Sequence, residues 1–276
     1  MDCRKWIDRY SIDCSLKYSS GQTRKNYKSC VTTFLYHFNK FREPKEIPNE
    51  EIKKWLLNAN TINTRKHRLC AINSFYEITV GMPNKISKIP YPKSDKKLPI
   101  VLSQDEMQKM FDVCENTKHK TILSLLYSCG LRVSELINLR WSHIDRSRMI
   151  INIIQAKGKK DRQVMLPTTM ITQLEKYWRE YKSIDYIFNG QSSPQYSSRS
   201  VNEIVKQLAE KAGINKKVYT HLMRHNCFTH MVENGVDINL IQRLAGHNNV
   251  KTTMIYTHIS HNLISKIQSP ISQIRL

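Results

Sequence analysis

The segment 220–258 constrains the fold most, because polar residues alternate there with signals for helix ends. Gly235 and Gly246 stand where helices usually stop, and Asp237 stands where a new helix can be N-capped. Three short helices separated by two corners are therefore predicted. The first of them has an apolar stripe around Phe228 that can be buried, which leaves its other face to polar side chains.

Four residues of this segment are candidates for chemistry: His221, Arg224, His247 and Tyr256. His221 and Arg224 are three positions apart, so they share one face of the first helix. His247 lies just past the Gly246 corner, so its direction is independent of the preceding helix. Taken alone, the same residues could also belong to a packed core with a solvated polar face.

A metal site is a second alternative, because His221 and His225 are four positions apart on the same predicted helix. H-L-M-R-H lacks the glutamate of H-E-x-x-H, and no third group of ligands is evident in the sequence. We therefore expect no metal ion and no other cofactor.

The order of these motifs resembles the C-terminal signature of the tyrosine recombinases, the family of phage integrases and Xer proteins. H-L-M-R-H, L-A-G-H and Tyr256 stand where that family has H-x-L-R-H, L-G-H and a nucleophilic tyrosine. Met223 and Ala245 replace the usual leucines of the two motifs but leave the polar positions intact. The resemblance implies that the four candidate residues belong to an active site.

An upstream motif resembles the first arginine box of the same family. It reads G-L-R-V-S-E-L and assigns Arg132 to the active site. Gly130 is expected to stop one helix, and Arg132 to point away from the core. Glu135 follows three positions later, where it could hold the guanidinium in place. Without the family, an exposed arginine here would be an ordinary surface residue.

A predicted hairpin supplies the remaining basic residues of the expected site. A β-branched run over 149–154 and a second strand over 162–166 flank the turn A-K-G-K-K-D-R. The turn resembles the family's K-G-x-K-x-R hairpin, whose first lysine is catalytic, and this role carries over to Lys157. Lys159 on the same tip is a candidate DNA contact. Any basic β-turn would look similar in isolation.

Three amphipathic helices are predicted in the N-terminal half, over 23–41 and beginning at Asn49 and Thr64. The first has a basic rim, and the basic first turn of the third opposes the helix dipole, so an external anion could offset it. A solvated face would look the same. Six basic residues are the candidate DNA contacts of this half: Arg24, Lys25, Lys28, Arg65, Lys66 and Arg68. T-R-K-N-Y-K-S-C-V-T-T-F resembles the family's N-terminal core-binding domain.

These patterns predict a mainly α-helical protein of two domains. Residues 1–88 form an all-helical core-binding domain that contacts DNA, 89–99 a linker, and 100–276 an α+β catalytic domain with a small antiparallel sheet and a C-terminal tail. The whole stretch 81–99 has four prolines and five lysines and is predicted to be extended. A capping box at Ser103 begins the second domain. The family resemblance implies that the tail, 262–276, packs on a neighbouring protomer, although it could fold back on its own domain.

Both halves of the chain are basic, which favours a polyanionic partner over other ligands. Lysine and arginine number 44 against 23 acidic residues, for a net charge of +21. Divided near Pro92, the halves carry 17 basic and 8 acidic residues, then 27 and 15, so +9 and +12. A charge excess can also serve solubility. Seven cysteines without a C-x-x-C pair and the lack of a membrane-spanning run lead us to expect a cytoplasmic, soluble protein.

The expected chemistry is attack on a DNA phosphodiester by the Tyr256 phenol. Only about one phenol in a thousand is ionised at neutral pH, so a base or a strong local positive field is needed, and His221 is the candidate base. Arg132 and Arg224 would neutralise the charge that develops on the two non-bridging oxygens. Lys157 would protonate the leaving 5′ oxygen.

Three functions remain open on the sequence, all with double-stranded DNA as the partner. A site-specific recombinase would pair two DNA sites in a homo-tetramer and pass through a covalent 3′-phosphotyrosine, with His247 hydrogen-bonded to the phosphate. A type IB topoisomerase would use related chemistry on one duplex as a monomer. A regulator that does not cut need not keep all six polar residues, and their presence in family order disfavours it.

Overall fold

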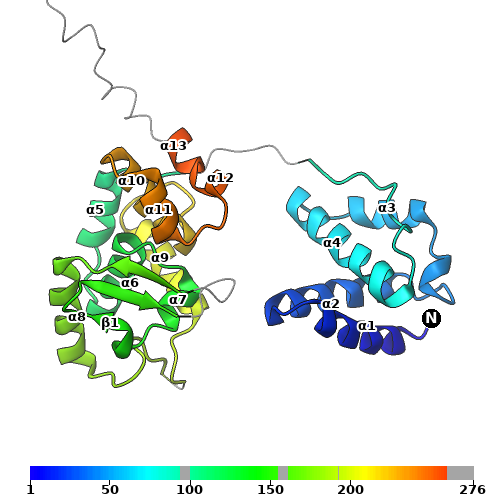
Figure 1. Cartoon of the computed structure of the whole chain (residues 1–276), viewed down its shortest axis with the longest axis horizontal. Helices are drawn as coiled ribbons and strands as arrows, with labels where there is room; N and C mark the ends of the chain where they lie inside the picture. Colours follow the sequence, from blue (N-terminus) through cyan, green and yellow to red (C-terminus); the bar gives the residue numbers. More distant parts are fainter. Residues whose placement is uncertain (94–99, 155–160, 192, 260–276) are drawn as a thin grey trace, which may run out of the picture. The chain divides into compact units, whose positions relative to one another are not determined.

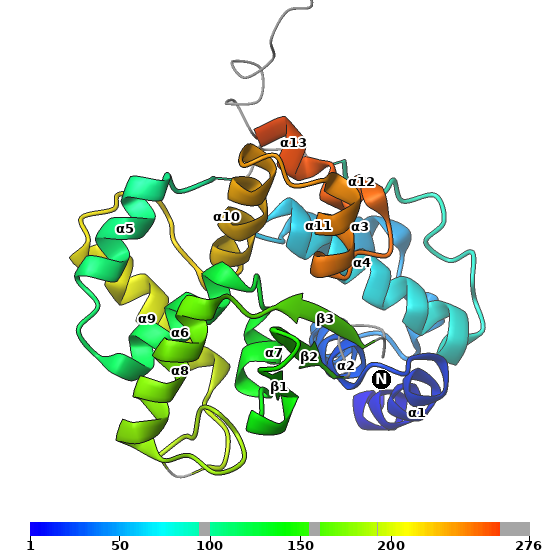
Figure 2. The same ribbon diagram turned by 60° about the vertical axis from the view of Figure 1, so that its left-hand side comes forward.

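The computed structural model describes residues 1–93, 100–154, 161–191 and 193–259. The chain divides into two compact units, Met1–Lys97 and Leu98–Leu276. Figures 1 and 2 show the described part of the first unit as helices and the second unit as helices with a small sheet at one side. Within the described residues, no helix has the length and apolar character needed to span a bilayer.

Over residues 1–93 the first unit has four α-helices and two short irregular helices. They are α1 (Cys3–Lys17), α2 (Gly21–His37), η1 (Pro44–Glu46), α3 (Asn49–Leu57), α4 (Ile62–Phe75) and η2 (Tyr76–Val80). The sequence did not predict α1, although the Asp2 side chain caps it by accepting from the Lys5 amide. Two predicted helices have different bounds: α2 is capped by Ser20 and ends at His37, and α4 is capped by Thr61 and begins at Ile62 rather than at Thr64.

An aromatic core holds these helices together. The Phe34 ring contacts the rings of Trp55 and Phe75 edge to face, with centroids 5.2 and 6.5 Å away. Tyr76 is fully buried, and its hydroxyl donates to the Pro44 carbonyl at 2.9 Å. Basic side chains are therefore left on the outside of the unit.

The prediction that all of 81–99 is extended is wrong for its first part. The Lys85 amide donates to the Met82 carbonyl at 3.1 Å, and the Ile89 amide donates to the Ile86 carbonyl at 2.9 Å. Ile86 is only 2% exposed and belongs to the first unit's core. Burying this apolar side chain is favourable in free energy, and an extended segment in water would leave it exposed. Residues 94–99 lie outside the described part.

The second unit begins with helices that surround a buried α6. Its helices are α5 (Gln104–Asp112), α6 (Thr117–Ser128), α7 (Val133–Ile137), η3 (Trp141–His143), α8 (Thr168–Tyr181), α9 (Ser198–Lys211), α10 (Thr220–Glu233), α11 (Ile238–Ala245), α12 (Val250–Thr253) and α13 (Ile255–Ile259). The predicted capping box is confirmed, because Ser103 and Glu106 exchange side-chain and backbone hydrogen bonds. Asp237 and Gly246 begin and end α11 as predicted.

A three-stranded antiparallel sheet in the order β1-β2-β3 completes the second unit. Its strands are β1 (Ile144–Asp145), β2 (Ile150–Ile153) and β3 (Arg162–Met165). In the predicted hairpin Ile151 pairs with Val164 and Ile153 with Arg162, so the apolar side chains alternate toward the core. The short β1 was not predicted. The expected fold class, mainly helical with a small antiparallel sheet, is confirmed.

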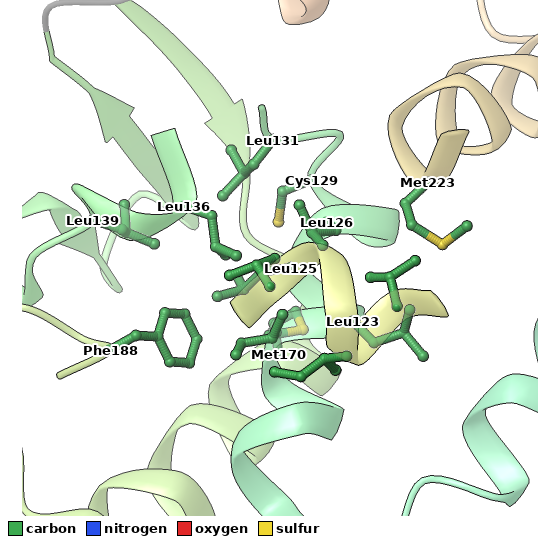
Figure 3. Packing of buried hydrophobic residues seen from close by; sticks show 14 of the residues in the cluster. Leu123, Leu125, Leu126, Cys129, Leu131, Leu136, Leu139, Met170, Phe188 and Met223 are labelled. Atoms are coloured by element: carbon green, nitrogen blue, oxygen red, sulfur yellow. The ribbon is translucent and has the colours of Figure 1, made fainter. Parts of the chain in front are cut away.

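Figure 3 shows how the core positions the residues that follow α6. Leu125 and Leu126 of α6 lie among Leu131, Leu136 and other apolar side chains from α7, α8 and α10, and these four leucines are fully buried. The end of α6 is thus anchored against both α7 and α10. The turn that carries Arg132 therefore begins from a rigid support.

Candidate active site

The turn between α6 and α7 places the first arginine. Gly130 has a φ of +58°, and a Cβ added there would lie 2.6 Å from the Phe228 ring. Only glycine fits this approach of the turn to α10. The turn presents the Gly130 carbonyl to Arg224, whose Nη1 donates to it at 2.5 Å, and sets Arg132 at the N-cap of α7.

One carboxylate holds two arginines at this turn. Arg132 donates to Glu135 from its Nη1 and from its backbone amide, both at 2.8 Å, which confirms the predicted contact. Arg162 forks onto the same carboxylate, with Nη1 at 2.5 Å and Nη2 at 2.8 Å. Burial alone would raise the pKa of Glu135, but the hydrogen bonds and charges of Arg162 and Arg132 lower it to about 2.

The end of α11 gathers three guanidinium groups. The Ala245 carbonyl accepts from Arg132 Nη2 at 3.3 Å and also from Arg224 Nη2. The Leu244 carbonyl accepts from Arg162 Nε at 2.9 Å. Carbonyls at a helix C-terminus carry partial negative charge and lack intrahelical partners, so cations are stabilised there. The two arginines that the sequence assigned to chemistry therefore meet at one backbone oxygen.

Arg224 is buried, contrary to the expectation that it projects from its helix together with His221. It is 1% exposed, and its guanidinium lies 4.8 Å from the Phe228 ring centre. Burial, with Arg132 as the next cause, lowers the pKa of Arg224 to about 10. The side chain stays charged at neutral pH because two carbonyls and the ring face replace water.

Three histidines lie near these arginines. The His221 ring, on the exposed side of α10, is 4.6 Å from the His225 ring and nearly perpendicular to it. His247 Nδ1 shares a hydrogen bond of 3.0 Å with Thr253 Oγ1. Partial desolvation by neighbouring side chains, together with the nearby positive charges, lowers the pKa of all three, to about 4 for His225 and His247. These imidazoles are therefore neutral at pH 7 and can accept protons.

Tyr256 lies in a small apolar cluster behind the histidines. It is 1% exposed, and its ring stacks on His247 at 6.2 Å and tilts against Phe228 at 5.6 Å. Burial raises the pKa of the phenol to about 12, although Arg224 and Arg132 oppose the shift. The phenol thus belongs to the same electrostatic group as the two arginines, in a protonated and enclosed state.

The sequence missed Arg162, although the hairpin motif contained it. Arg162 is the last residue of the K-G-x-K-x-R motif, but the resemblance assigned a role only to the first lysine of that motif. Lys157 and Lys159 lie outside the described residues. Among those that are described, no group of three or more histidine, cysteine or acidic side chains is arranged to hold a metal ion.

The basic residues of the first unit differ in how they are held. Lys25 and Lys28 are exposed on α2, where Arg24 is half-buried, and Lys28 Nζ lies 3.2 Å from a serine hydroxyl of α1. Arg65 and Lys66 are half-buried on α4. Arg68 donates to the Trp55 carbonyl at 3.0 Å and covers its ring at 4.5 Å, so a phosphate would compete with this packing.

Comparison with known proteins identifies the family. The sequence pattern of the phage integrase family matches residues 101–262, a segment that includes all six predicted active-site positions. The chain belongs to the phage integrase family. Tyrosine recombinases make up this family, so the chain is a tyrosine-type site-specific DNA recombinase and its partner is double-stranded DNA. The resemblance seen in the sequence, the enzyme class and the general function are thereby confirmed.

Named relatives cover most of the chain. Tyrosine recombinase XerA of Pyrococcus horikoshii is 33% identical over 242 residues, covering 84% of each protein. Tyrosine recombinase XerD of Oceanobacillus iheyensis is 33% identical over 268 residues, covering 87% of this chain and 89% of XerD.

Solved structures share the fold. A crystal structure of XerA recombinase covers 100% of both chains at 29% identity, with a TM-score of 0.58. A lambda integrase dimer bound to a core site covers 96% of this chain and 98% of that chain at 17% identity, with a TM-score of 0.77.

Proposed function

We propose that this recombinase cuts and rejoins DNA through Tyr256, whose phenol oxygen attacks a phosphodiester to form a 3′-phosphotyrosine and a free 5′ hydroxyl. The 5′ hydroxyl of a partner strand then attacks the phosphotyrosine and releases the enzyme. One ester replaces another at each step, so the linkage energy is retained and no nucleotide cofactor is needed.

The observation that carries this proposal is the meeting of Arg132 and Arg224 at the Ala245 carbonyl. Two guanidinium groups fixed at one point match the two non-bridging oxygens of a phosphate, on which negative charge grows as the phenol attacks. Because both groups are already held by hydrogen bonds, little reorganisation is needed in the transition state.

Proton transfer is assigned to the histidines and to the hairpin. His221, whose pKa is lowered and whose ring is the most exposed of the three, takes the phenol proton as general base. His247 hydrogen-bonds the phosphate. Lys157 protonates the leaving 5′ oxygen, a role that rests on the family resemblance.

Tyr256 must leave its apolar cluster for the reaction to begin. At 1% exposure the side chain is closed off from an incoming backbone phosphate. The residue sits on α13, a helix of five residues that follows α12, a helix of four, so few intrahelical hydrogen bonds hold this segment in place. DNA binding would shift the segment toward an open arrangement that brings the phenol to the arginines.

The first unit would hold the duplex as a core-binding domain. Basic side chains on α2 and α4 would supply phosphate contacts: Arg24, Lys25, Lys28, Arg65 and Lys66, whereas Arg68 is already engaged with Trp55. Lys159 would add one from the hairpin. If about 10 phosphates are contacted in all, log affinity falls with log salt at a slope near −9.

The active assembly would be a homo-tetramer on two paired DNA sites, with the tail, 262–276, packed on a neighbouring protomer. A structure of XerH bound to a palindromic difH substrate, in a post-cleavage complex, has a TM-score of 0.76 to this chain at 18% identity. The match in fold to a protein solved with its DNA substrate supports an assembly on DNA. Sedimentation with and without a two-site duplex tests the tetramer.

A nicked suicide duplex tests the chemistry directly. Once the short fragment that carries the free 5′ hydroxyl diffuses away, religation stops and the covalent adduct accumulates. We expect an adduct with the unmodified protein and none with Tyr256→Phe, which keeps the ring and lacks the nucleophilic oxygen. An adduct that persists in the phenylalanine variant would show that another residue attacks.

A two-site recombination assay beside supercoil relaxation separates the proposal from single-duplex topoisomerase activity. Exchange of flanking DNA between two sites supports recombination. Relaxation of any plasmid by a monomer, without exchange, would favour the type IB alternative.

A further inference from the structure

Among the arginines of the second unit that the structure describes, Arg162 is fully engaged in hydrogen bonds and has no part in the proposed chemistry. Its side chain is 7% exposed, and each of its three guanidinium nitrogens donates a hydrogen bond. Two of these bonds reach Glu135 at the start of α7, and the third reaches Leu244 at the end of α11. A residue at the first position of β3 therefore joins three separate elements.

The position of Arg132 depends on this arrangement. Glu135 is 5% exposed at its side chain and forms ion pairs with both Arg132 and Arg162. Its Oε1 accepts from both guanidinium groups, and its Oε2 accepts from Arg162 Nη2 and the Arg132 amide. Without Arg162, one positive charge and two donors are lost, and a buried carboxylate left under-satisfied will reorient. Arg132 would move with it.

The corner that carries His247 also rests on Arg162. Gly246 has a φ of +60°, and a Cβ added there would lie 2.9 Å from Arg162 Cδ. The arginine stem thus packs directly under the residue between Ala245, whose carbonyl binds Arg132 and Arg224, and His247. Arg162 contacts the corner through its stem and holds Glu135 through its guanidinium.

We propose that Arg162 is a positioning residue that fixes the two halves of the phosphate site relative to each other, Arg132 on α7 and the Ala245–His247 corner after α11. This inference rests on the proposed function, because it assumes that Arg132 stabilises charge on the phosphate. All three guanidinium nitrogens of Arg162 donate to Glu135 or to the Leu244 carbonyl, so Arg162 acts through these two partners.

The test compares single-turnover adduct formation on two suicide duplexes, one with a normal scissile phosphate and one with a methylphosphonate. The methyl group removes a negative charge, so the reaction needs less help from correctly placed guanidinium groups. Outer partners that orient functional side chains typically contribute about 10- to 100-fold to activity. We expect Arg162→Met and Arg162→Lys to slow adduct formation by about that factor on the phosphate, since lysine cannot fork onto a carboxylate.

Two readouts separate positioning from general damage. The deficit on the methylphosphonate should shrink to about threefold or less, and DNA affinity should stay within about threefold, because the phosphate contacts are unchanged. Arg146→Met is the matched control: it removes the exposed ion pair with Glu175 in the same unit and should react at the unmodified rate. Thermal unfolding of each variant identifies any that fails to fold, and Arg162→Lys, which keeps stem and charge, is the milder of the two.

An unmodified rate in a folded Arg162 variant would overturn the inference. So would an equal loss on both duplexes, which indicates a structural defect rather than misplaced charge. Failure of the unmodified protein to form an adduct on the phosphate duplex would instead remove the proposed function. The two failures are therefore distinguishable in one experiment.

Discussion

The two units place their positive charge in opposite ways. In the first, an aromatic core around Phe34 is closed to water, and cations such as Lys25 and Lys28 lie outside it. In the second, Arg224 is 1% exposed and Arg162 is 7% exposed at its side chain, and both end on backbone carbonyls.

This difference separates two uses of a guanidinium or ammonium group. Exposed cations attract a polyanion at long range, are screened by salt and can replace one another. Buried cations need fixed acceptors to offset lost hydration, so their geometry is set before any ligand arrives. Substitutions should therefore affect rate and stability in the second unit, and affinity and its salt dependence in the first.

The largest effect is expected for Arg224→Lys. The lysine retains a charge but cannot reach both the Gly130 and the Ala245 carbonyls, and it offers no fork to a phosphate. Removing one such donor should slow adduct formation by about 10²–10³-fold. Single-turnover kinetics on a suicide duplex measures the rate. Retention of most of the activity would mean that charge alone, without the fork, is sufficient.

The buried histidines should make the second unit sensitive to acid. The pKa of His225 and of His247 is near 4 in the folded protein, below the ordinary value of 6.5, because of burial and the charges of Arg224, Arg132 and His221. Between pH 6.5 and 4 the unfolded chain therefore binds protons that the folded chain does not. The unfolding free energy should fall across that window as the pH is lowered and be flat above it.

Urea unfolding at a series of pH values measures this change in unfolding free energy. Trp141 and Trp178 provide the fluorescence signal, and Trp6 and Trp55 are replaced by phenylalanine so that the signal comes from the second unit only. His225→Gln should remove part of the acid sensitivity. Equal stability at pH 7 and pH 5 would contradict the assigned environment of the histidines.

A smaller loss, of stability, is expected from a substitution in the turn before Arg132. Gly130→Ala combines a left-handed φ with a Cβ placed 2.6 Å from the Phe228 ring, so either the turn or the ring must shift. Such strain costs about 1–3 kcal/mol. Gly213→Ala is the matched control, because its φ is also positive, at +69°, but its Cβ would meet nothing within 4 Å. Thermal unfolding of the two variants should therefore differ, and equal melting temperatures would show that the contact with Phe228 is not limiting.

Helix ends and polar motif positions could be predicted because they depend on local chemistry. Asp237 and Ser103 cap helices as expected, and Gly246 ends α11 in a left-handed conformation. The burial of Arg224 could not be predicted, since helical spacing shows which residues share a face and does not show what covers that face. Two carbonyls from distant segments cover it here.

Arg162 illustrates the same limit for the site. Its place at the end of the hairpin motif was visible, but its partners, Glu135 and the Leu244 carbonyl, come together only in three dimensions. Likewise Ile86 stands in a stretch rich in lysine and proline, and only the folded unit shows that it is buried. Contacts over long sequence separations are therefore what a single sequence leaves out.

The smallest effect is expected in the first unit. Lys25→Gln together with Lys28→Gln removes two exposed charges from α2, and neither lies in the aromatic core, so the melting temperature should hardly change. DNA affinity should fall modestly, and the slope of log affinity against log salt should become shallower by about 2. The adduct rate at saturating DNA should stay unchanged, because these side chains act before chemistry.

Arg68→Gln provides the contrast within the same unit. Its guanidinium already rests on Trp55, so this substitution should lower stability and leave the salt slope almost unaltered. Fluorescence anisotropy across a salt series distinguishes the two variants. If Arg68→Gln instead changed the slope as much as one exposed lysine does, the guanidinium would leave Trp55 on binding, and the division between outer and buried cations would not hold in this unit.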